Sequence, residues 1–165
     1  MLSLLIALST VAQQPLLNPR LEPLAFLVGS CWRGTFPDGR QTDTHCFTPA
    51  HGGAFVRDLH VVAGAARPYS GETLYRWDGA AGQIRFDYYA SDGSHSGGAA
   101  LPAADGLAFP AETHRAPDGS ETVIRSSWTR DGADAYLVRA EARQVERWRE
   151  LWRMRMVRTG PTPAR

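Results

Sequence analysis

Asp-Gly dipeptides recur along this chain of 165 residues, and most of them lie about thirteen residues apart. They are Asp38-Gly39, Asp78-Gly79, Asp92-Gly93, Asp105-Gly106, Asp118-Gly119 and Asp131-Gly132. Asp-Gly between alternating apolar and polar runs is a strong β-hairpin signal, because both residues tolerate the positive φ of tight turns. Gly52-Gly53 and the segment 63–68 continue the spacing through the longest gap. The rhythm predicts about nine turns and therefore about ten consecutive antiparallel strands.

The turn spacing also places the strands. We expect them over residues 31–36, 42–48, 54–62, 69–77, 83–90, 95–101, 107–114, 121–129 and 135–142, after a short helical turn within 18–28. Pro110 predicts a bulge or a sheet edge in its strand. Residues 145–157 fit both a helical stripe and strand alternation, and we favour a strand because it would pair with the first strand and remove both sheet edges. The predicted fold class is all-β, a closed or nearly closed up-and-down antiparallel meander barrel with a lumen for a small ligand.

Composition limits the classes of partner. The chain is 43% hydrophobic, which suffices for one domain, assigned to residues 15–160, with 161–165 expected to be a disordered tail. A net charge of +1 gives no long-range attraction for nucleic acid. All basic residues are Arg, which excludes Schiff-base chemistry and a P-loop lysine. The arginines between 139 and 158 are interpreted as a solvated strand face rather than an anion site.

Residues 1–14 are predicted to be a signal peptide. A short apolar run is followed by small residues that resemble a signal-peptidase site, with Thr10 and Ala12 at the positions that the enzyme reads. The run is too short to span a bilayer, and nothing later in the chain is apolar enough to do so. The sequence therefore predicts a periplasmic or secreted protein. A wrongly chosen start codon or a loose N-terminal segment is the alternative.

The two cysteines can be placed by register. If Asp38-Gly39 is a two-residue turn, paired residues have numbers that sum to 77, and Cys31 and Cys46 meet this condition. Directly opposed cysteines lie within the reach of a disulfide, and exported proteins favour one. We predict a Cys31–Cys46 disulfide on the outside of the barrel, with two buried free thiols as the alternative.

The same register turns Trp32 inward together with Asp43 and His45. The next loop has unknown length: an even length puts Asp58 and His60 inside, and an odd length puts Phe55, Arg57 and Leu59 there. The candidate ligand-binding residues of the lumen are His45, Asp58, His60, Tyr75, Phe86 and Tyr88. His51, His95 and His114 lie in or near turns and are expected to be exposed. With an even loop, the cluster of His45 and His60 with Asp43 and Asp58 could bind a metal, a haem or an anionic ligand head. We favour the interpretation that these histidines are hydrogen-bonded lining or surface residues, and we predict neither a metal site nor a catalytic motif.

The segment Phe26-Leu27-Val28-Gly29-Ser30-Cys31-Trp32-Arg33-Gly34 resembles the opening of calycin barrels, the class of lipocalins, fatty-acid-binding proteins and nitrobindins. Tyr69-Ser70-Gly71-Glu72-Thr73 and Trp77-Asp78 are similar to those of bacterial lipocalin-like exported proteins. In calycins an arginine of the last strand covers the early Trp, and the resemblance assigns this role to Arg153 or Arg155 over Trp32. It implies a barrel that binds a small molecule, and haem is the cofactor that the nitrobindin branch suggests.

The leading functional hypothesis is an exported barrel that binds an apolar or amphipathic small molecule without catalysis. The alternatives are an enzyme that uses lumen His, Asp or Tyr side chains as acid and base, a haem protein similar to nitrobindin, and a domain that acts through a protein partner. The volume of the lumen and the side chains that enter it distinguish among these hypotheses.

Overall fold

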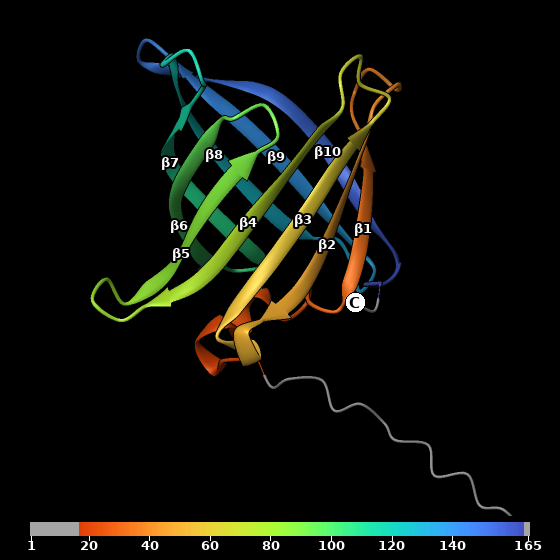
Figure 1. Ribbon diagram of the computed structural model, residues 1–165, viewed down its shortest axis with the longest axis vertical. Coiled ribbons are helices and arrows are strands. Elements are labelled where there is room, and N and C mark those ends of the chain that lie inside the picture. Colours follow the sequence, from red (N-terminus) through yellow and green to blue (C-terminus); the bar gives the residue numbers. More distant parts are fainter. Residues whose placement is uncertain (1–16, 164–165) are drawn as a thin grey trace, which may run out of the picture.

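The computed structural model describes residues 17–163 (Figure 1). Its ten strands form one closed barrel in which strands adjacent in sequence are paired and β1 pairs with β10. The strands are β1 (Ser30–Thr35), β2 (Thr42–Ala50), β3 (Phe55–Ala63), β4 (Tyr69–Asp78), β5 (Gln83–Ala90), β6 (His95–Ala103), β7 (Gly106–Arg115), β8 (Glu121–Arg130), β9 (Ala135–Gln144) and β10 (Arg147–Pro161). Two short 3-10 helices accompany them, η1 (Pro19–Leu24) and η2 (His51–Gly53). The predicted up-and-down barrel is confirmed, and the ambiguous last segment is a strand.

The Asp-Gly dipeptides mark turns, but most of these turns are longer than two residues. In the first hairpin the backbone N–H of Phe36 donates to the carbonyl of Gln41 at 2.9 Å, which leaves a four-residue loop. Asp38 Oδ1 accepts from the backbone N–H of Arg40 at 2.9 Å, and Gly39 has a φ of 68°. This loop has the same centre as the expected two-residue turn, so the register is unchanged.

The register of the first hairpin therefore places Cys31 opposite Cys46 and Trp32 opposite His45. A disulfide joins the cysteines, whose Cα atoms are 4.1 Å apart, as predicted. Cys31 is only 8% exposed, so the bridge is more buried than the predicted position on the outside of the barrel implied. The end of β10 lies alongside it, where Gly160 pairs with Cys31.

The loop between β2 and β3 determines which face of β3 lines the lumen. Ala50 pairs with Phe55, so four residues connect the strands and the parity is even. His45 then lies opposite His60, and Asp58 and His60 point inward with 2% and 8% of their surface exposed.

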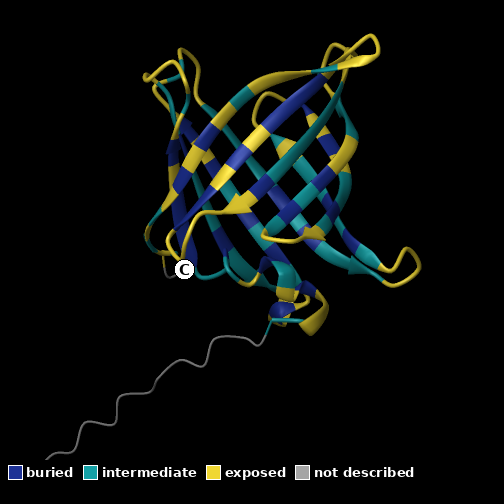
Figure 2. Ribbon diagram, turned by 180° about the vertical axis from the view of Figure 1, so that it is seen from behind, coloured by how far each residue is buried: buried dark blue, intermediate teal, exposed yellow. Residues whose placement is uncertain are grey.

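Helix η1 closes one end of the barrel, below the strands in Figure 1. Its Leu21 and Leu24 are fully buried, as are Trp32 and the nearby Leu27. The indole of Trp32 donates to the carbonyl of Leu27 at 3.2 Å and packs edge-on against Tyr136, with ring centroids 5.2 Å apart. Figure 2 shows buried residues alternating with exposed ones in η1, and exposed residues in the loops of the opposite end. We call this packed region the closed end.

The arginine that covers Trp32 is Arg158, not Arg153 or Arg155. Its guanidinium carbon lies 4.3 Å from the indole centroid. Arg153 instead forms an ion pair with Glu150, and Arg155 forms one with Asp131. The reason is alternation along β10: burial of Met154 and Met156 turns the odd-numbered arginines outward.

The sheet extends slightly beyond the expected domain limit. β10 ends at Pro161, and the backbone N–H of Thr162 donates to the carbonyl of Gly29 at 3.2 Å. The last residues of the predicted tail, 164–165, and the predicted signal peptide, 1–14, lie outside the described residues. Within 17–163 no helix has the length and apolar character needed to cross a membrane.

Candidate functional site

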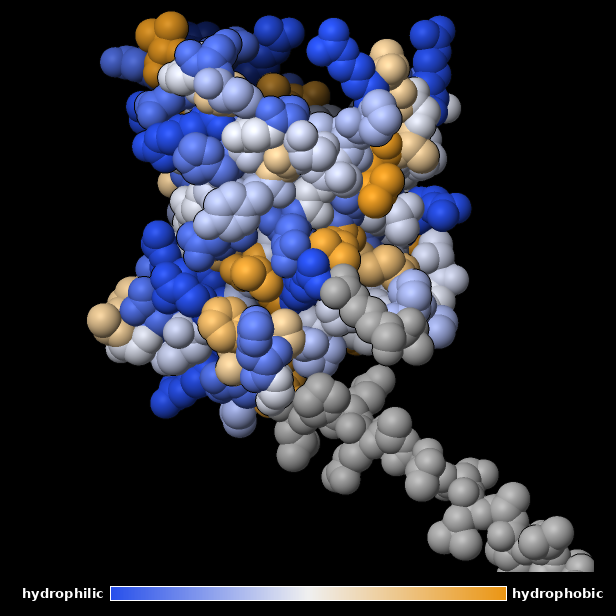
Figure 3. All heavy atoms as spheres, viewed as in Figure 1, coloured by the Kyte–Doolittle hydropathy of each residue, from blue (hydrophilic) through white to orange (hydrophobic). Residues whose placement is uncertain are grey.

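A cavity of about 400 Å³ occupies the barrel above the closed end. Its lining reaches Gln41 and Ala65, beside the loops that follow β1 and β3, and Figure 3 shows a hollow among polar side chains at that end of the molecule. All six predicted lumen residues line it: His45, Asp58, His60, Tyr75, Phe86 and Tyr88. The even number of residues in the loop between β2 and β3, and the alternation of side chains along β4 and β5, direct all six into the same cavity.

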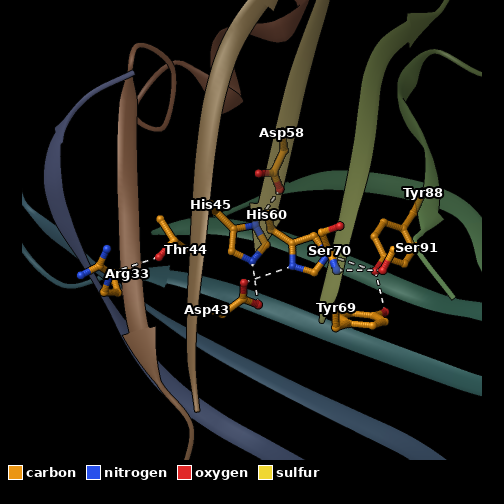
Figure 4. Close-up of polar contacts among 10 residues, drawn as sticks. All are labelled: Arg33, Asp43, Thr44, His45, Asp58, His60, Tyr69, Ser70, Tyr88 and Ser91. Carbon is orange, nitrogen blue, oxygen red and sulfur yellow. Dashed lines mark hydrogen bonds and ion pairs between the residues drawn. The ribbon is translucent and has the colours of Figure 1, made fainter. Parts of the chain in front are cut away.

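The polar wall of the cavity is a continuous chain of hydrogen bonds (Figure 4). His45 Nδ1 lies 2.8 Å from Asp58 Oδ2, and His45 Nε2 lies 3.1 Å from Asp43 Oδ2. The other oxygen of Asp43 contacts His60 Nδ1 at 3.1 Å. His60 Nε2 lies 3.1 Å from the Tyr88 hydroxyl. We call these five residues the polar cluster.

His45 lies between two carboxylates. A neutral imidazole has one N–H, whereas both ring nitrogens of His45 face an acceptor oxygen, so the imidazolium satisfies the geometry. Burial alone would lower the pKa of His45, but the Asp58 charge and the hydrogen bonds to Asp43 and Asp58 outweigh it and raise the pKa well above the usual value. Burial opposes the charge of Asp43 too, yet His45 and His60 hold the pKa of that carboxyl well below its usual range. The cluster therefore contains separated charges at neutral pH.

The chain of hydrogen bonds ends at two tyrosines. The hydroxyl oxygens of Tyr88 and Tyr69 are 2.7 Å apart, and burial together with Tyr69 raises the pKa of Tyr88 still further above its usual value. Gly71 makes this arrangement feasible, since a Cβ on it would lie 2.5 Å from His60 Nε2 and 2.5 Å from Tyr88 Cε2. Any side chain at this position would displace the His60–Tyr88 pair.

The wall opposite the polar cluster is largely apolar, with Phe109, Ile124 and Trp128 in the lining. It carries one acid, Glu112, whose Oε1 accepts from the Ser96 hydroxyl at 3.2 Å. Burial raises the pKa of Glu112 to about 7, and its Oε2 is buried with no hydrogen-bond partner in the part of the chain that the structure describes. Glu112 is thus a carboxyl that titrates near neutrality inside the cavity.

Three titratable residues of the cavity were not predicted from the sequence. Tyr69 and Glu112 were not singled out, although Tyr69 shares the inward face of β4 with Tyr75 and alternation alone could have placed it there. His114 was expected to be exposed because it is close to a turn, but it lines the cavity. The register of β7 shifts between Phe109 and Glu112, next to Pro110, and sequence patterns do not predict how such a bulge redirects the following side chains.

Haem does not fit His45 and His60. Each has one ring nitrogen against Asp43 and the other against Asp58 or Tyr88. A porphyrin plane in front of either ring would have to take the place of one of these partners. A small ion differs, because Asp43 could share it with both rings. The nearest donor atoms of Asp43, His45 and His60 lie within 4.8 Å of one another.

Comparison with known proteins supports the architecture. No family model matches this sequence, and no curated protein matches it. Among solved structures, the crystal structure of Rv2717c from M. tuberculosis aligns with a TM-score of 0.59, covering 87% of this chain and 99% of that one at 19% identity. At this identity the likeness concerns the fold alone, and this chain shares the fold of that structure.

Proposed function

We propose that this protein binds one small amphipathic molecule inside the barrel and releases it chemically unchanged. The observation that carries the proposal is the cavity of about 400 Å³, which has an aromatic wall and a polar wall. Ligand pockets have volumes of about 300–1,000 Å³ and combine apolar linings with a few polar groups that orient the ligand. The apolar body would pack against Phe109 and Trp128, with its polar end toward the polar cluster.

The charges in the cavity wall indicate which polar group the ligand carries. Among the described residues that line the cavity, none is arginine. The imidazolium of His45 is already shared by Asp43 and Asp58. A ligand carboxylate would therefore meet net negative charge, whereas a hydroxyl or amine could donate a hydrogen bond. We expect a fatty alcohol to bind more tightly than the fatty acid of equal length.

The test uses delipidated protein and a pair of pyrene-labelled probes, a fatty acid and the matching alcohol. Ser126 lines the cavity, so Ser126→Phe should fill it and weaken probe binding by at least about tenfold, or about 1.4 kcal/mol. Ser127 follows it in β8 with its side chain on the other face, and Ser127→Phe should change the affinity by less than twofold. Absence of saturable binding, or equal effects of both substitutions, would refute the proposal.

A second candidate function is acid–base catalysis, and one observation favours it. Tyr69, Tyr88, His60 and Asp43 form an unbroken row of hydrogen bonds that leads from the cavity to a buried carboxylate. Such a row can move a proton to or from a bound molecule. Mass spectrometry of ligand recovered from the purified protein separates the two functions, since a binding protein returns it unchanged.

We also infer a calycin-like barrel outside the cytoplasm. The Cys31–Cys46 disulfide supports an oxidising compartment, and the Arg158 guanidinium over Trp32 supports the calycin relationship. Cell fractionation tests the location: recovery of the protein with reduced thiols in the cytoplasm would contradict it.

A further inference from the structure

We propose that Asp43, His45 and His60 form a binding site for one divalent transition-metal ion, with Zn²⁺ as the test case. The site goes beyond the proposed ligand binding and does not depend on it. The remaining coordination positions of the ion would face the cavity.

The positions of the donor atoms suit such an ion. His45 and His60 are directly opposed on β2 and β3, with nearly parallel rings whose centroids are 4.8 Å apart. One nitrogen of each ring lies 3.1 Å from a different oxygen of Asp43. Two donors at this separation subtend about 95° at an ion that is about 2.1 Å from both, which metal geometries tolerate. Small side-chain rotations suffice to draw the nitrogens together, because the cavity leaves room beside them.

The outer partners of the histidines are those of metal ligands. A histidine bound to a metal donates its other N–H to a carboxylate or a similar acceptor, which fixes the orientation of the ring. His45 has Asp58 in this position at 2.8 Å, and His60 has the Tyr88 hydroxyl at 3.1 Å. Each ring therefore has one nitrogen toward Asp43 and the other held from behind.

The charges of the site suit a divalent ion. The carboxyl groups of Asp43 and Asp58 both contact His45, in a poorly solvated place. With His45 Nε2 and His60 Nδ1 on the ion, the other nitrogen of each ring faces Asp58 or the Tyr88 oxygen. The two positive charges of the ion then balance the two carboxylates.

Three protein donors leave coordination positions open, as in sites where a metal binds an exchangeable ligand. These positions face the cavity, where Tyr75 and Trp128 belong to the same lining. Water, or the polar end of a bound molecule, would complete the coordination.

The experiment begins with full-length protein stripped of metal by a chelator. Titration with Zn²⁺ in a calorimeter and with Co²⁺ by visible absorption should show one ion per chain. His45→Gln and His60→Gln should weaken binding by more than about a hundredfold, and Asp58→Asn, which removes only an outer partner, by about 10–100-fold. His51→Gln, at an exposed histidine in η2, is the matched control and should bind like the unaltered protein.

Ring ¹⁵N NMR of the unaltered protein provides a readout that does not depend on the folding of any variant. Zn²⁺ should shift the resonances of His45 Nε2 and His60 Nδ1 and leave those of His51 unchanged. Absence of saturable binding of both ions would overturn the proposal. Undiminished binding in His45→Gln and His60→Gln, or shifts confined to exposed histidines, would overturn it too.

Discussion

The closed end and the cavity are adjacent parts of one barrel that differ in what they bury. The closed end is filled with apolar side chains, whereas the cavity has buried polar groups and open space. At the closed end, apolar side chains from η1 pack around Trp32, and the indole N–H has a backbone acceptor. In the cavity, β3 buries Asp58 and His60 beside an open volume of about 400 Å³. The two parts meet at the pair Trp32–His45 on β1 and β2.

This contrast indicates that the closed end contributes mainly to the stability of the fold and the cavity mainly to ligand recognition. Close packing of apolar side chains stabilises the fold, and each lost methylene costs free energy. A cavity with buried charges contributes less, because desolvation offsets the attraction between the charges. Substitutions at the closed end should therefore reduce stability, and substitutions in the cavity should mainly change binding.

The largest expected effect is at the closed end. Trp32→Ala removes a fully buried indole, leaves Arg158 without its aromatic contact, and should lower the free energy of unfolding by about 3–5 kcal/mol. Trp148 is the control: it is only partly buried, on the outer face under Arg125, and its change to Ala should cost about 1 kcal/mol. Urea unfolding measures both, and equal losses would show that the closed end is not the stabilising region.

A smaller effect should appear in the pH dependence of stability. The pKa of Glu112 is about 7 in the folded protein against 4.5 for an unperturbed Glu. A carboxyl with a raised pKa contributes stability that is complete below pH 4.5 and is lost as pH rises through 7. After allowance for its partial exposure, the loss should be about 2 kcal/mol.

Glu112→Gln keeps the shape of the side chain but cannot ionise. Urea unfolding between pH 4.5 and 7.5, in both proteins, measures the contribution of this carboxyl as the difference between the two curves. Parallel curves would mean that Glu112 is not buried as described.

The smallest effect on stability should come from Gly71. Gly71→Ala places a Cβ against His60 and Tyr88 and should cost about 1 kcal/mol through overpacking. It should nevertheless weaken probe binding, because the His60–Tyr88 pair must separate. Gly79→Ala, in the loop after β4, meets only Trp77 Nε1 at 4.0 Å and serves as the control. A stable Gly71→Ala protein with unchanged probe binding would show that this pair does not contribute to recognition.

Much of the architecture was predictable because turns are local. The spacing of Asp-Gly predicted the strands. The expected two-residue turn at Asp38-Gly39 predicted the disulfide correctly, although the loop in the structure has four residues. The prediction succeeded because the expected turn and the observed loop have the same centre, so the strand register is the same. The same register placed Asp43 and His45 on the lumen face.

Other features depended on more than one strand. The choice between Arg57 and His60 rested on the length of a single loop. Arg153 and Arg155 were assigned to Trp32 by analogy, although the burial of Met154 and Met156 would have excluded both. His114 entered the cavity because the bulge near Pro110 changes the register of β7.

The sequence by itself determined how many strands form, where they turn and which residues can alternate inward, because those properties depend on neighbours along the chain. Only the tertiary structure decided that Arg158 covers Trp32, that Asp43 joins two histidines, and that a cavity remains beside them. These depend on barrel closure, which brings together side chains that are distant in sequence through bulges and loop parities that local patterns leave open.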